Sequence, residues 1–84
     1  MATSTQQATT VEVYGGREVE VRRVWRRGDT VRLDIRCGAR WVVDISRFTT
    51  SADDVDVVTT WNTDGQLADV PLPEWIDDLL MRLR

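Results

Sequence analysis

The chain has 84 residues, with 11 arginines, 14 acidic residues, one cysteine and no lysine or histidine. This length allows one domain with a modest core. Because Cys37 is the only cysteine, no disulfide can form within the chain, and the lack of histidine removes the commonest zinc ligand and the commonest general base.

The first nine residues, MATSTQQAT, are mostly small and polar and predict a disordered lead, so that residues 10–84 form the folded domain. This lead has no basic start and no apolar run, which argues against a secretory signal. No stretch reaches the roughly 18 apolar residues of a membrane-spanning helix. A single cysteine is typical of a reducing compartment. We therefore expect a cytoplasmic protein that does not associate with membranes.

Alternation of apolar and polar residues predicts a run of strands. The predicted strands lie at 10–14, 17–21, 30–37, 40–46 and 54–61, with a short sixth one at 66–70. Glycine-containing breaks between the first four occur at hairpin distance, whereas the longer connection at 47–54 leaves open which strand the fifth one pairs with. One apolar and one polar face is typical of an antiparallel sheet that is wetted on one side.

In the last segment, the apolar residues no longer alternate with polar ones and instead follow helical spacing. Pro73 suits the first position of a helix, and the apolar residues that follow fall on one helical face, namely Trp75, Ile76, Leu79, Leu80 and Leu83. A helix of about 11 residues is marginal alone, so this face must pack on the sheet. The predicted fold is α+β and mainly β: an antiparallel meander of five to six strands, as an open sheet or a small half-barrel, with one C-terminal helix packed on its apolar face.

The second hairpin can form in two registers. A two-residue turn at Gly28-Asp29 places Val24 opposite Leu33 on the inner face and turns Trp25 outward. This register requires a bulge just before Val24 to rejoin the core positions, and it directs Arg26 inward beside the hairpin tip.

A three-residue turn, Arg27 to Asp29, instead places Trp25 inside and drives Arg23 inward opposite Leu33. We favour the two-residue turn because an arginine near a hairpin tip can reach water, and because glycine suits the first position of such a turn. Trp25 is then expected on the wet face.

Arginines around this tryptophan form the candidate interaction surface, which comprises Arg22, Arg23, Trp25, Arg27, Arg32 and Arg36. An exposed tryptophan beside arginines can stack on a base or fill a pocket on a protein. The simpler interpretation is that Arg32 packs over Trp25 without any ligand, and that the other arginines pair with acidic residues of the same face. We favour a solvated, charge-paired face over a nucleic-acid groove.

No catalytic, cofactor-binding or metal-binding residues are predicted. Cys37 is expected to face inward on a strand without a base to activate it, and no glycine-rich loop precedes a helix to hold a phosphate. A meander of this size is also expected to leave little room for a pocket of about 300 Å³ or more. We therefore expect a non-enzymatic protein without a cofactor.

The predicted function is a small protein-interaction or adaptor module, whose partner is another protein or a second copy of the chain. Sheet edges and four tryptophans favour this function. The alternative is a nucleic-acid-binding module using the face with the arginines and Trp25. Nine arginines against six acidic residues in 1–48 support it, while the net charge of −3 opposes it. In a third hypothesis, the acidic residues of 49–84 cover the basic half of a partner or of the chain itself.

Overall fold

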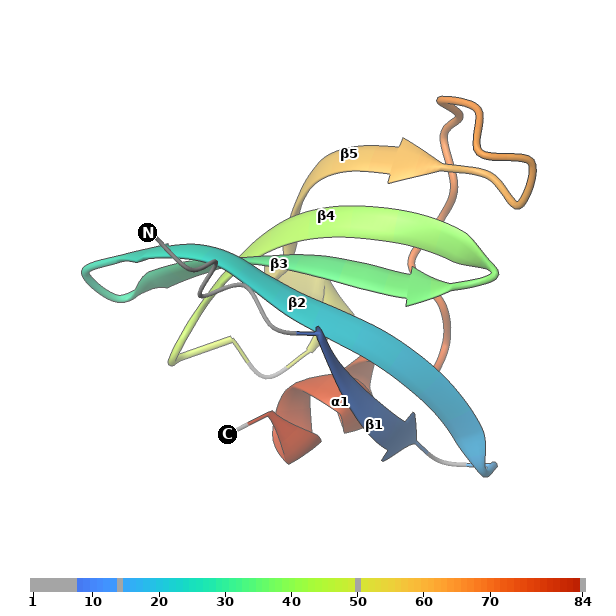
Figure 1. Cartoon of the computed structure of the whole chain (residues 1–84). Helices are drawn as coiled ribbons and strands as arrows, with labels where there is room; N and C mark the ends of the chain where they lie inside the picture. Colours follow the sequence, from blue (N-terminus) through green and yellow to red (C-terminus); the bar gives the residue numbers. More distant parts are fainter. Residues whose placement is uncertain (1–7, 14, 50, 84) are drawn as a thin grey trace, which may run out of the picture.

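Five antiparallel strands and one α-helix make up the fold of the described residues (Figure 1). The computed structural model describes residues 8–13, 15–49 and 51–83. The strands are β1 (Ala8–Val13), β2 (Arg17–Arg27), β3 (Thr30–Cys37), β4 (Ala39–Ser46) and β5 (Asp56–Trp61), and they lie in the order β1-β2-β3-β4-β5. A 3-10 turn, η1 (Ala52–Asp54), precedes β5, and α1 (Ile76–Arg82) ends the described chain. The predicted meander with a C-terminal helix is confirmed, and its sheet is open.

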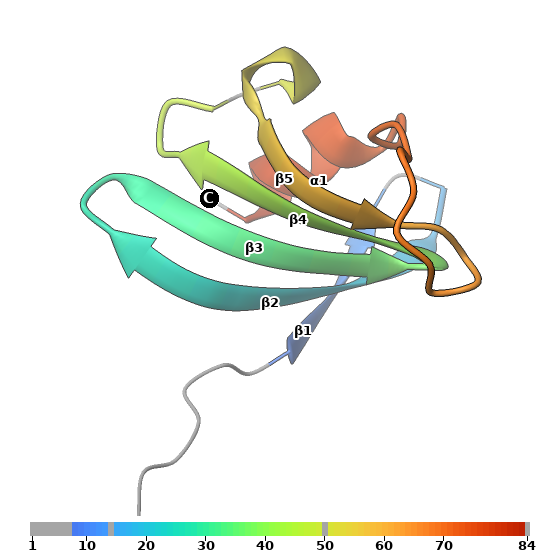
Figure 2. The same cartoon turned by 90° about the horizontal axis from the view of Figure 1, so that it is seen from above.

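The core lies between the concave face of the sheet and α1 (Figure 2). Alternate residues of the strands supply the sheet side of the core, chiefly Val19, Val21, Leu33, Ile35, Trp41 and Val43, while Ile76, Leu79 and Leu80 supply the helix side. This is the predicted apolar face of the last segment, and it packs as expected. No helix of the described residues has the length and apolar character to cross a lipid bilayer.

The predicted sixth strand does not form in the described residues. The stretch 66–70 forms only an isolated bridge between Leu67 and Trp61, because the Thr60 hydroxyl donates to the carbonyl of Ala68 and accepts from the amide of Val70. The long connection before β5 does not change the strand order, since β5 pairs with the preceding strand, β4. Residues 1–7 of the predicted lead, and Tyr14, lie outside the described residues, and β1 begins at Ala8.

The helix is shorter than predicted. It spans seven residues, because the chain from Pro73 to Trp75 forms a turn before the helical hydrogen bonds begin. The amide of Ile76 donates to the carbonyl of Pro73 at 3.1 Å, and the amide of Leu79 donates to the carbonyl of Trp75 at 3.1 Å. The side chain of Asp77, in the first turn, accepts a hydrogen bond from the amide of Ala52 at 2.7 Å, which ties the helix to η1.

The hairpin of β2 and β3 uses both predicted registers, one in each half. Near its tip Trp25 pairs with Arg32, as the two-residue turn requires, and Gly28 has φ +59°, which only glycine adopts readily. Farther down, Arg23 pairs with Leu33, as the three-residue turn requires. The register shifts between Arg23 and Trp25, so Val24 is the extra residue of a β-bulge. The predicted pairing of Val24 with Leu33 was therefore wrong, and the bulge lies later than predicted.

Candidate functional site

Trp25 lies on the convex face of the sheet between two arginines. The guanidinium carbon of Arg32 is 4.8 Å from the centre of the Trp25 ring, and that of Arg27 is 5.7 Å away. Both distances are within the range of cation–π contacts. The ring is half-buried. The tryptophan therefore already stacks on side chains of its own chain.

Arg32 is held in turn by Asp44 of the neighbouring strand. Its Nε and Nη2 atoms donate to the two carboxylate oxygens at 2.7 and 3.0 Å, which is a two-pronged ion pair. The hydrogen bond from Arg32 is the main cause that lowers the pKa of Asp44 below its usual value. This arginine is consequently not available to a ligand without breaking the pair.

Asp34 is the second acidic centre of the convex face, and it is buried. Arg40 donates to it through Nε and Nη2, both at 2.9 Å, and Arg36 donates at 3.4 Å. Burial raises the pKa of Asp34, but the hydrogen bonds from Arg40 and Arg36 lower it by more, so it lies below the usual value. The guanidinium of Arg40 also lies 4.3 Å from the centre of the Trp61 ring.

The predicted interaction surface is thus divided between two faces. Trp25, Arg27 and Arg32 lie together on the convex face, and cross-strand pairing places Arg22 and Arg36 there with Asp34. Arg23 lies on the concave face, opposite Leu33, because it precedes the bulge. Ion pairs with aspartates neutralise much of the positive charge on the convex face.

The ion pairs of Asp34 predict how stability depends on pH. An aspartate whose pKa is lower in the folded than in the unfolded chain stabilises the fold above about pH 4, and loses that contribution as the pH falls through the folded pKa. We expect the free energy of unfolding to fall less steeply below about pH 4 in Asp34→Asn than in the wild type. Urea unfolding from about pH 7 to about pH 2.5 measures this. Asp69→Asn, at an exposed residue outside the ion pairs of the described chain, is the control; a wild-type slope in Asp34→Asn would contradict the expectation.

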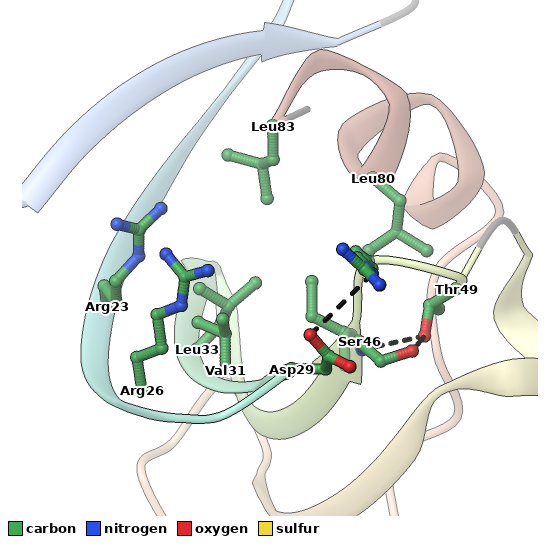
Figure 3. A pocket seen from close by; sticks show the side chains of 11 residues that line it. Arg23, Arg26, Asp29, Val31, Leu33, Ser46, Thr49, Leu80 and Leu83 are labelled. Atoms are coloured by element: carbon green, nitrogen blue, oxygen red, sulfur yellow. Dashed lines mark hydrogen bonds and ion pairs between the residues drawn. The ribbon is translucent and has the colours of Figure 1, made fainter.

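A groove opens on the concave face where the end of α1 leaves the sheet (Figure 3). Its volume is about 480 Å³. Apolar side chains from β3, β4 and the helix end form its floor, namely Val31, Leu33, Ile45, Leu80 and Leu83. The prediction that a sheet of this size leaves little room for a pocket was wrong, because the helix covers only part of the curved sheet.

Arg23 and Arg26 form one wall of this groove. Figure 3 shows both side chains rising from β2 toward the space in front of Leu83. Residues three apart in a regular strand face opposite sides, and the extra residue Val24 places these two on the same side. Arg26 makes a long hydrogen bond of 3.5 Å to the carbonyl of Gly28. Within the described residues, neither arginine forms an ion pair.

The opposite wall belongs to the turn after β4. Its Arg47 forms an ion pair with Asp29 of the β2–β3 turn, with Nε and Oδ1 3.7 Å apart. The amide of Ser46 donates to the hydroxyl of the buried Thr49 at 3.0 Å, which closes the turn. Among the described residues, the groove therefore combines an apolar floor with three guanidinium groups and one carboxylate, an arrangement suited to holding an anionic, partly apolar ligand.

The groove was missed from the sequence, although its arginines left a signal. Each of the two alternative registers predicts one inward arginine, Arg26 in the first and Arg23 in the second, whereas the bulge turns both inward. Cys37 faces inward as predicted and is half-buried against the core. Within the described chain, no three histidine, cysteine or acidic side chains gather in a way that could hold a metal ion.

Comparison with known protein families, curated proteins and solved structures finds no significant match.

Proposed function

We propose that the protein is a small, non-enzymatic protein-interaction module that binds a segment of a partner protein in the concave groove. The observation that carries this proposal is the combination of an apolar floor with Arg23 and Arg26, two guanidinium groups without an ion pair in the described part of the chain. Protein-binding sites commonly centre on a desolvated apolar pocket that is surrounded by polar groups.

The convex face supports the nucleic-acid alternative less well. Binding to nucleic acid depends mainly on arginines and lysines that neutralise phosphates. Arg32 and Arg40 are each committed to an aspartate through two hydrogen bonds, and the chain carries a net charge of −3. Arg32 also covers the ring of Trp25, on which a base would have to stack.

Selection from a displayed library of random peptides tests the proposal. The protein is attached through its N-terminus, because Leu80 and Leu83 near the C-terminal end line the groove. Leu83→Trp is expected to fill the groove, whereas Met81→Trp adds the same ring to an exposed position of α1, two residues earlier. We expect peptides to be enriched on the wild type and on Met81→Trp, and about tenfold less on Leu83→Trp.

Thermal unfolding of both variants confirms that they are folded before the selection. Absence of enrichment on the wild type, or equal enrichment on Leu83→Trp, would contradict the use of this groove for a protein partner.

A further inference from the structure

We infer that the segment bound in the groove is acidic, with one large apolar side chain next to two carboxylates that form ion pairs with Arg23 and Arg26. This inference rests on the proposed function and specifies the chemistry of the partner. The groove holds Arg23, Arg26 and Arg47 against one carboxylate, that of Asp29, so its described lining residues carry an excess of two positive charges. Charge complementarity therefore favours a partner segment that carries two negative charges.

The convex face shows how this chain uses its arginines when a carboxylate is within reach. Arg32 and Arg40 each place two nitrogen atoms on one aspartate, at distances between 2.7 and 3.0 Å. Arg23 and Arg26 present the same planar donor groups to the groove without such a partner among the described residues. A guanidinium group is well suited to a carboxylate because it can donate two parallel hydrogen bonds.

The bulge at Val24 places these two arginines on the same face of the sheet. Without an extra residue, Arg23 and Arg26 would face opposite sides of the sheet, and only one would reach the groove. Bulges recur beside functional sites, where they redirect a side chain. The apolar floor of Val31, Leu33 and Leu83 lies next to the arginine wall, so one segment can satisfy both.

A second copy of the chain also carries an acidic stretch with exposed apolar side chains. The exposed Val57 and Val58, with exposed fractions of 47% and 45%, follow Asp53, Asp54 and Asp56. We nevertheless assign the groove to a separate partner, because this stretch includes an edge strand with a bulge of its own, where its register shifts against β4. Edge strands with a bulge resist pairing with another molecule.

Binding of two labelled peptides to the intact protein tests the inference. The acidic probe has blocked ends and Asp-Leu-Glu at its centre, and the neutral probe has Asn-Leu-Gln instead. By fluorescence anisotropy, we expect the neutral probe to bind the wild type about tenfold more weakly. We also expect Arg23→Glu/Arg26→Glu to bind the acidic probe at least about tenfold more weakly. Raising NaCl from about 50 mM to about 500 mM should weaken the binding of the acidic probe but not that of the neutral probe.

The matched control is Arg22→Glu/Arg27→Glu, which makes the same change of charge on the same strand but on the convex face. It should bind the acidic probe as the wild type does. A third probe with Lys-Leu-Lys at its centre should bind Arg23→Glu/Arg26→Glu better than the wild type, which shows that this variant is folded and has reversed its preference.

The outcomes separate the two proposals. If the peptide library yields ligands that depend on the groove but carry no acidic residues, the inference fails and the proposed function stands. If the library yields no such ligand at all, the proposed function fails. If sedimentation shows that the wild type self-associates and that Arg23→Glu/Arg26→Glu is monomeric, the occupant is a second copy, and the assignment to a separate partner is overturned.

Discussion

Replacing Leu79 with alanine is expected to lower the free energy of unfolding by about 2–5 kcal/mol. Leu79 is 0% exposed and lies in the middle of α1, between the helix and the concave face of the sheet. Removal of its side chain eliminates buried apolar area and leaves a cavity that the neighbouring strands can close only in part. Because native proteins are stable by only about 5–15 kcal/mol, this loss is a large fraction of the total.

Met81→Ala provides the control on the same helix. Met81 is 69% exposed, so its truncation should change the free energy of unfolding by no more than about 0.5 kcal/mol. Urea unfolding followed by circular dichroism measures both variants. Equal stabilities would mean that the helix does not pack on the sheet in solution, and the groove between them would lose its basis.

The fold was predictable because it follows from side-chain periodicity. In β3, Leu33 and Ile35 alternate with polar residues and are buried, and in the last segment Ile76 and Leu79 share one helical face and are buried together. The absence of the predicted sixth strand was not predictable, because the hydroxyl of Thr60 takes up backbone groups that a regular ladder would have paired. A side chain that competes with the backbone in this way leaves no periodic signal.

The groove was harder to predict because it depends on a compromise within one hairpin. The turn at Gly28 favours one register, and burial of Val19 and Val21 favours the other. The bulge at Val24 satisfies both by inserting one extra residue into β2, and no rule applied to either half alone places it. The volume of the groove also depends on where α1 ends on the sheet, which the apolar pattern of the helix does not determine.

Trp41 links the sheet to the segment that leads into the helix, and its replacement by alanine is expected to cost about 3–5 kcal/mol. Its ring is buried and meets the ring of Trp75 edge to face, with the ring centres 5.8 Å apart. Its Nε1 atom donates a hydrogen bond of 3.2 Å to the carbonyl of Pro71. Both contacts join β4 to the segment 71–75, which leads into α1.

Trp41→Phe separates these contributions, because it retains a buried ring but cannot donate the hydrogen bond. We expect it to lose about 1–3 kcal/mol, which combines the net loss of one hydrogen bond to the exposed Pro71 with the loss of packing from the smaller ring. Trp25→Phe, on the convex face, should lose less, since the ring of Trp25 is only half-buried. Urea unfolding ranks the variants, and near-ultraviolet circular dichroism reports the Trp41–Trp75 contact. If Trp41→Ala were as stable as Trp25→Phe, this contact would not hold the start of the helix. The position of Leu80 and Leu83 over the groove would then depend on the middle of the helix alone.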